Sequence, residues 1–252
     1  MTTQVKTSEE IAALKESGKM LAEVMAVLKK LLTAGMTTKD LAIIAKKTLK
    51  PLGGQPTFLG YQGFPDVICV SLNDEVVHGI PDASRIINED DVVSMDFGVT
   101  YRGMITDSAV TIALDKAPEN AKKMIHATEQ ALYKGIKVIK DNLPIGDISA
   151  VIQQSLETGG YGVVRDLVGH GVGHELHEEP NIPNYGQKGE GFKLKKGMSV
   201  AIEPMASLGD YKVYTDKNGW AVRTKDGSLS AHFEHTVLVG EKSAEILTQI
   251  RN

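Results

Sequence analysis

The chain has 252 residues, of which 42% are hydrophobic and 24% charged, and its formal net charge is −4. This composition is typical of a globular protein, and a small negative charge without a long Lys/Arg run argues against nucleic-acid binding, which depends on phosphate neutralisation. No apolar run approaches the roughly 20 residues that span a bilayer, and MTTQVKTSEE has no signal-like apolar core, so we expect a cytoplasmic protein that binds no membrane.

The predicted helices occur twice along the chain in the same order. Thr7-Ser8-Glu9-Glu10 is typical of a capping box and begins a long amphipathic helix that runs to Gly35, and Thr37 begins a shorter helix that stops at Pro51. A long helical pattern then runs from Ala117 to about Asp141, and a short one follows Pro144 and ends before Gly159-Gly160. An offset of 107 residues superimposes Leu41, Ile44, Ala45, Leu49 and Gly53 on Ile148, Val151, Ile152, Leu156 and Gly160, which indicates an internal duplication.

Each pair of helices is followed by two predicted strands that carry acids. Residues 91–96 and 198–203 both predict strands that end on a carboxylate, and residues 106–112 and 233–238 predict the second strand of each pair. We therefore expect an α+β fold of two αα-ββ halves, related by an approximate two-fold around a central, mostly antiparallel sheet with the helices on one side. A single domain would span residues 1–252, with halves at about 1–115 and 116–252.

The four acids of these strands indicate a metal centre. An ionised carboxylate in an apolar strand is strongly unfavourable unless it is paired or coordinated, and no Lys or Arg occurs in residues 92–99 or 106–114. Any one of the acids is equally well explained as a strand-end residue that faces water. If Asp96, Asp107, Glu203 and Glu234 converge, their charges would balance two divalent cations. The single cysteine, Cys69, excludes a disulfide and a paired-thiolate site, so that nitrogen and oxygen must hold any metal.

The stretch GHGVGHELHEEP, residues 169–180, contains His170, His174 and His177. A zincin helix requires His-Glu-x-x-His, and this stretch is one residue short of that spacing. Its glycines would each cost about 1 kcal/mol inside a helix, so a glycine-spaced strand or loop that passes close to a site fits better. We expect one metal-binding imidazole here, and for His174 we favour an ordinary surface position.

The acids and one of these histidines together carry a family resemblance. Asp96 and Asp107, His170 in GHGVG, Glu203 in AIEP and Glu234 in HFEHT resemble the metal-binding set of the methionine aminopeptidases, and YQGFP and VHGIP resemble the bacterial type I enzymes. The resemblance covers essentially the whole chain. It implies the pita-bread fold and removal of the N-terminal methionine from peptides and nascent proteins, preferentially when the second residue is small. It places Asp96 on one metal, Asp107 and Glu234 as bridges, and His170 and Glu203 on the other metal.

The resemblance also implies roles outside the metal set. Glu203 would carry the proton in catalysis, and His78 and His177 would contact the substrate. The methionine side chain would enter a pocket formed by Phe58, Tyr61, Phe64, Cys69, Leu176 and Trp220. His174 and Leu176 depart from residues that are common in the relatives, and Phe58 replaces a cysteine found in some bacterial members, which leaves the shape of the pocket open. From the residues alone, Trp220 could equally be a loop aromatic that covers the core, and Cys69 reads as a small buried apolar residue rather than a nucleophile.

Four carboxylates and one imidazole form an oxygen-rich site that suits Mn²⁺, Fe²⁺, Co²⁺ or Zn²⁺. The resemblance also allows a monovalent cation near Asn73, Glu75 and Ser230. We expect a monomer whose partners are the N-termini of peptides and nascent chains, and we leave open a contact with the ribosome.

Two other functions remain as alternatives. Prolidases and proline-specific aminopeptidases resemble the same catalytic half, but they usually carry an added N-terminal domain, and the first helix of this chain begins by about residue 8. A non-catalytic binding module is the second alternative, and the presence of all five ligands argues against it.

Overall fold

The computed structural model describes residues 5–250, so the first four residues of MTTQVKTSEE lie outside it. Its helices are α1 (Ser8–Leu31), α2 (Thr38–Leu49), α3 (Glu119–Lys137) and α4 (Ile145–Thr158), with short 3-10 helices η1 (Lys50–Leu52) and η2 (Tyr61–Gly63). Both predicted N-terminal caps are present as capping boxes, Thr7 with Glu10 and Thr37 with Asp40.

Two helix ends differ from their predictions. Helix α1 ends at Leu31, whereas the sequence predicted a helix to Gly35. Helix α3 ends at Lys137, whereas the sequence predicted a helix to about Asp141. The backbone amides of Asp141 and Asn142 donate to the carbonyl oxygens of Gly240 and Leu194 instead of continuing the helix. Tertiary hydrogen bonds therefore satisfy these backbone groups in place of helical ones.

The strands form four sheets, and within residues 5–250 every pairing between them is antiparallel. The strands are β1 (Gln55–Pro56), β2 (Cys69–Leu72), β3 (Glu75–Val77), β4 (Val92–Tyr101), β5 (Met104–Ala113), β6 (Gly162–Val163), β7 (Val168–Gly171), β8 (Glu178–Pro183), β9 (Ser199–Ile202), β10 (Met205–Ser207), β11 (Val213–Thr215), β12 (Val222–Thr224), β13 (Ser230–His232), β14 (His235–Val239) and β15 (Ala244–Ile246). Within the four sheets the strand orders are β1-β4-β2 with β5 paired to β4, β13-β10-β6, β11-β12-β3, and β15-β14-β9-β7-β8.

The two halves use their acid-bearing strands differently. In the first half β4 and β5 form one long hairpin, and β4 continues to Tyr101, so the prediction that this strand ends at Asp96 was wrong. In the second half the corresponding strands are interrupted, β9 and β10 around Glu203 and Pro204, and β13 and β14 around Glu234. Proline lacks the backbone N–H that would continue the ladder, and this explains why β9 stops where β4 does not.

A seam of hydrogen bonds joins the two hairpins. The amide of Glu234 donates to the carbonyl oxygen of Ala109 at 3.0 Å, and the amide of Ala109 donates back at 3.3 Å. The hydroxyl of Thr236 accepts from the amide of Asp107 and donates to its carbonyl oxygen, both at 2.8 Å. Asp107 and Glu234, 127 residues apart in the sequence, are therefore neighbours because β5 lies beside β14.

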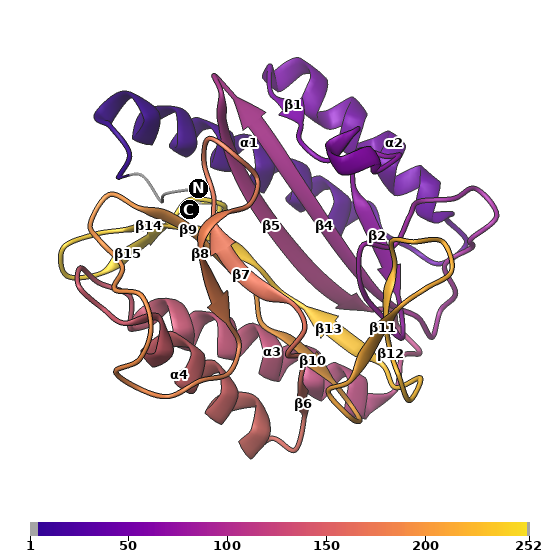
Figure 1. Ribbon diagram of the computed structural model, residues 1–252. Helices are drawn as coiled ribbons and strands as arrows, with labels where there is room; N and C mark the ends of the chain where they lie inside the picture. The colour runs from indigo at the N-terminus through magenta and orange to yellow at the C-terminus, as the bar shows by residue number, and fades with distance from the viewer. Residues whose placement is uncertain (1–4, 251–252) are drawn as a thin grey trace.

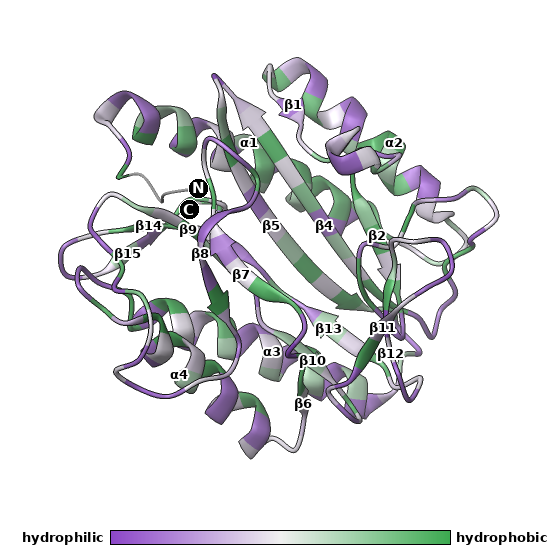
Figure 2. Cartoon of the chain, viewed as in Figure 1, coloured by the Kyte–Doolittle hydropathy of each residue, from purple (hydrophilic) through white to green (hydrophobic). Residues whose placement is uncertain are grey.

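The helices cover the sheets in two pairs. Figure 1 shows α1 behind β4 and β5, α2 to the side of β4, and α3 and α4 beside β6, β10 and β13. Each pair closes its own core, α1 and α2 with Phe97 of β4, and α3 and α4 with Val200 of β9. Figure 2 shows hydrophobic and hydrophilic residues alternating around α2, α3 and α4, as expected for amphipathic helices that pack on one face.

Candidate active site

A cavity of about 170 Å³ lies where the acid-bearing strands of the two halves meet. All the residues that the sequence predicted for the metal centre, the catalytic groups and the methionine pocket line it: Phe58, Tyr61, Phe64, Cys69, His78, Asp96, Asp107, His170, Leu176, His177, Glu203, Trp220 and Glu234. The structure adds lining residues that the sequence did not single out, namely Gln62, Val77, Leu167, Val168, Met205 and His232.

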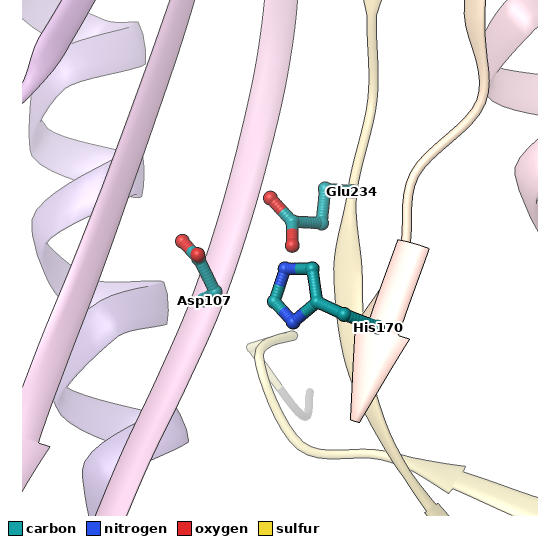
Figure 3. Close-up of side chains that lie close together, drawn as sticks. All are labelled: Asp107, His170 and Glu234. Carbon is teal, nitrogen blue, oxygen red and sulfur yellow. The ribbon is translucent and has the colours of Figure 1, made fainter. Parts of the chain in front are cut away.

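Three potential metal ligands converge most closely. One ligand atom each from Asp107, His170 and Glu234 lie within 4.8 Å of one another, and all three residues are buried. Figure 3 shows their side chains pointing toward a common space from three separate chain segments. The other two predicted ligands flank this group, because the Asp96 carboxyl lies close enough to that of Asp107 for its charge to raise the pKa of Asp96, and Glu203 Oε1 lies 3.4 Å from His170 Nε2.

The electrostatics of this group are unfavourable for a protein without cations. Burial raises the pKa of Asp96, Glu203 and Glu234 well above the ordinary range, with a further rise from the neighbouring carboxylates, and raises the pKa of Asp107 to about 7. Burial lowers the pKa of His170 to about 3, so this imidazole is neutral and able to coordinate.

Two carboxylate oxygens of the group, Asp96 Oδ1 and Glu234 Oε1, are buried and have no hydrogen-bond partner within residues 5–250. Buried polar atoms in native proteins are almost always satisfied, so these oxygens are available to a ligand. A clustered set of carboxylates and a neutral imidazole fits divalent cations in its charge and in its donor atoms.

The glycines of GHGVG allow the strand that carries His170 to pack closely between two neighbouring strands of its sheet. Strand β7 lies between β8 and β9, with His170 opposite Ala201. A Cβ on Gly169 would lie 2.5 Å from the carbonyl oxygen of Ala201, and one on Gly171 would lie 2.2 Å from that of Glu179. His170 Nδ1 lies 2.9 Å from the carbonyl oxygen of Gly171, which leaves Nε2 to face the acids. The prediction of a glycine-spaced strand close to the site is confirmed.

The two predicted substrate-contacting histidines line the cavity from different segments. His177 precedes β8; its Nδ1 lies 2.8 Å from the Tyr61 hydroxyl, and its ring centroid is 4.4 Å from that of His170. His78 follows β3 with a φ of +60°, a backbone conformation that is uncommon for a residue other than glycine. Burial lowers the pKa of His78 to about 4, so it is a neutral group.

The predicted methionine pocket is one apolar cluster beside the acids. Phe58, Phe64, Cys69 and Leu176 are buried in it, and Tyr61 and Trp220 pack against it. Trp220 meets Phe64 edge to face at a centroid distance of 5.1 Å, so it belongs to the cavity wall and does not merely cover the core. Cys69 is buried as expected, and burial raises the pKa of its thiol, which disfavours the nucleophilic thiolate.

His174 belongs to a different cluster. Its Nε2 lies 2.7 Å from Glu10 Oε1 and its Nδ1 3.4 Å from Lys6 Nζ, and it is not among the described residues that line the cavity. The expected surface position of His174 is confirmed, although its contacts connect it to the first helix.

The groups expected to hold a monovalent cation already have protein partners. The carbonyl oxygen of Asn73 accepts from the amide of Ser230 at 2.9 Å and from its hydroxyl at 3.0 Å. The Glu75 carboxylate pairs with Arg85 and with Arg223. This cation site stays a prediction from the resemblance.

Comparison with known proteins identifies the family. Residues 12–241 match the model of metallopeptidase family M24. The chain is 44% identical over 244 residues to the methionine aminopeptidase of Clostridium acetobutylicum, an alignment that covers 97% of this chain and 98% of that relative. The chain belongs to the methionine aminopeptidases of metallopeptidase family M24. The crystal structure of the methionine aminopeptidase from Thermotoga maritima superimposes on this M24 chain with a TM-score of 0.97 at 44% identity, covering 99% of this chain and 100% of that one.

These matches confirm the predicted pita-bread fold. The prolidase from Pyrococcus furiosus shares this fold, with a TM-score of 0.78 at 22% identity. That superposition includes 98% of this chain and 66% of the prolidase chain. Within residues 5–250 of the M24 chain, no helix combines the length and the apolar character needed to cross a membrane.

Proposed function

We propose that the cavity is the active site of a two-metal aminopeptidase that removes the N-terminal methionine from peptides and nascent proteins, preferentially when the second residue is small. The observation that carries this proposal is the convergence on one cavity of three buried carboxylates, the half-buried carboxylate of Glu203 and one neutral imidazole, beside an apolar pocket. The names of the full-length relatives support the substrate class.

We assign the metal ligands as Asp96, Asp107, His170, Glu203 and Glu234. The proximity of Asp96 to Asp107 on one side, and of Glu203 to His170 on the other, supports a shared position for Asp107 and Glu234 between two cations. The oxygen-rich donor set suits Co²⁺, Mn²⁺, Fe²⁺ or Zn²⁺. When bound, the two ions would lower the pKa of a water molecule toward neutrality and polarise the scissile carbonyl group.

The side chains of the chain itself supply binding and proton transfer. The apolar cluster would take the methionine side chain and exclude water from the reacting atoms. Glu203 would carry the proton from the attacking water to the leaving amine. Its carboxylate lines the cavity, and His170 lies near only one of the two carboxylate oxygens, Oε1. His78 and His177 would donate hydrogen bonds to the substrate peptide as negative charge develops.

We further propose that residues 1–252 form one domain, with halves at about 1–115 and 116–252, that works as a monomer in the cytoplasm on peptide and nascent-chain N-termini. The seam between β5 and β14 supports a single domain, because each half contributes ligands to the same cavity. A ribosome contact and the monovalent cation stay predictions.

The deciding experiment measures methionine release from Met-Ala-Ser by the protein loaded with Mn²⁺ or Co²⁺. The wild-type protein should release methionine, and Asp107→Ala should abolish both metal retention and release. Full activity of a metal-analysed Asp107→Ala protein would contradict the assigned bridging role.

Two further measurements separate the alternatives. Competition between Met-Ala-Ser and Ala-Pro substrates distinguishes a methionine aminopeptidase from an X-Pro peptidase, and the apolar pocket favours Met-Ala-Ser. Metal analysis after mild purification distinguishes an enzyme from a non-catalytic binding module, which should retain no stoichiometric metal.

A further inference from the structure

His232 is a buried imidazole in the cavity to which the sequence and the family resemblance assigned no role. It is the last residue of β13, it lines the cavity, and 1% of it is exposed. Neither of its ring nitrogens has a hydrogen-bond partner within the part of the chain that the structure describes. A buried polar group without a partner is unfavourable, so an arrangement that keeps two such atoms in the active-site cavity calls for a functional reason.

The direction of the ring is set by the backbone of β13. The amide of His232 donates to the Thr111 hydroxyl at 2.8 Å, and that hydroxyl donates to the carbonyl oxygen of His232 at 2.7 Å. The pairing of His232 with Met205 in β10 holds the strand from the other side. Because β10 begins two residues after Glu203, the same pairing places the imidazole beside the Glu203 side chain.

The two oxygens of Glu203 face two different imidazoles. Glu203 Oε1 lies 3.4 Å from His170 Nε2, and Glu203 Oε2 lies 3.6 Å from His232 Nε2. The Asn184 amide donates to the carbonyl oxygen of Glu203 at 3.0 Å, so the backbone of Glu203 is fixed and only its side-chain torsions remain to be set. The 3.6 Å separation is just beyond hydrogen-bonding distance, and a shift of a few tenths of an ångström closes it.

His232 is not one of the five assigned ligands. Its imidazole approaches that set at Glu203, whose Oε2 lies 3.6 Å from His232 Nε2. His232 therefore contacts the metal centre through Glu203, in the way that outer residues of metal sites hydrogen-bond ligating carboxylates and fix their orientation.

We propose that His232 is a positioning residue, whose Nε2–H holds Oε2 of Glu203 and thereby keeps Oε1 directed toward His170 and the cation. The proposal rests on the proposed function, in which Glu203 is both a metal ligand and the proton carrier. A Glu203 side chain without this second contact would rotate about its last torsion, so the cation would be held less tightly and the proton acceptor would be misplaced.

The test compares His232→Leu with His232→Gln. Leucine fills similar space without a donor, whereas the glutamine side-chain amide can present an N–H to Glu203 Oε2. Binding of Co²⁺ to the metal-free proteins is measured by calorimetry and by the visible absorption spectrum of the bound ion, independently of activity. His232→Leu should weaken one of the two binding steps by about 10-fold to 100-fold and change the spectrum, and His232→Gln should restore both. His126→Leu, a change in helix α3 away from the cavity, serves as the control for loss of an imidazole.

Wild-type affinity and spectrum in His232→Leu would overturn the proposal, and so would equal losses in the leucine and glutamine variants. If His232→Leu does not fold, His232→Asn takes its place, because its amide is too short to reach Oε2. In a Glu203→Gln background the change at His232 should have no further effect on Co²⁺ binding, and additive losses would contradict coupling through Glu203. A wild-type protein that binds no divalent cation would instead refute the proposed function, and this inference with it.

Discussion

Lys6 and Glu178 form an ion pair at 2.7 Å in which both side chains are buried, with 0% and 5% of their surfaces exposed. The other oxygen of Glu178 accepts from the amide of His174 at 2.6 Å and from that of Glu175 at 3.3 Å. The pair thereby fastens the segment before α1 to the loop that leads to His177, across 172 residues of sequence.

Replacing Lys6 with methionine should lower the free energy of unfolding by about 3 to 5 kcal/mol, because it leaves the charge of Glu178 buried and unpaired. Urea denaturation of the metal-free proteins measures this change. Lys15→Met is the matched control, since its pair with Glu245 is 45% and 32% exposed and should contribute less than about 1 kcal/mol. Equal effects of the two changes would show that burial of the Lys6 pair has no energetic consequence.

His78→Asn should lower kcat about 100-fold while leaving metal content near that of the wild type. Asparagine is the better replacement because His78 has a φ of +60°, a conformation that asparagine tolerates more readily than alanine. The variant therefore removes the imidazole with little change in backbone strain. Steady-state kinetics with Met-Ala-Ser and metal analysis of the same preparation test this expectation, and loss of metal would indicate a structural role instead.

The stability of the metal-free protein should fall as the pH rises above 6.5. The raised pKa values of Asp96, Asp107, Glu203 and Glu234 mean that the folded protein keeps protons that the unfolded chain releases near pH 4, so these groups stabilise the fold at low pH and lose that contribution as the pH rises through their folded pKa values. Each group that is protonated only in the folded state contributes about 1.4 kcal/mol per pH unit.

The choice of pH window separates the carboxyl groups from the histidines. The lowered pKa values of His170 and His232, about 3, make the stability rise with pH instead of falling. This effect is confined to pH values below about 6.5, where the histidines of the unfolded chain gain protons and those of the folded protein do not. Thermal melts between pH 6.5 and about 8 therefore report mainly the carboxyl groups. A stability that rises across this window without metal would contradict the crowding of the four acids.

Divalent cations should stabilise the wild-type protein and not Asp107→Asn. A cation at 100 times its dissociation constant adds about 2.7 kcal/mol to the free energy of unfolding, because it binds only the folded state. The metal-free Asp107→Asn protein should itself be more stable than the metal-free wild type at pH 8, since one buried charge is removed. Melting curves with and without Mn²⁺ test both expectations, and an equal rise in Tm for the two proteins would show that the ion binds elsewhere.

Much of the fold and the site follows from local patterns in the sequence. The capping boxes at Thr7 and Thr37 begin helices for reasons that lie within four residues, and apolar periodicity marks the buried faces that follow. Acids in otherwise apolar strands indicated coordination, and all five predicted ligands and the six pocket residues line one cavity.

What escaped sequence reasoning depends on contacts between distant segments. The interruption of β9 had a local signal in Pro204, but the pairing of β5 with β14 depends on how two independently plausible hairpins dock. His232 carried one usable signal, because it lies only two residues before the predicted ligand Glu234 in the sequence. Its nearness to Glu203 comes from the register between β10 and β13.

The amino-acid sequence by itself determined which residues are candidates, since helix caps, strand alternation and the chemistry of carboxylates and imidazoles are properties of short segments. Only the tertiary structure decided which of these groups meet, that Lys6 pairs with Glu178, and that Glu203 lies between two imidazoles. The physical reason is that such contacts depend on the packing of helices and strands far apart in the chain, which no local pattern specifies.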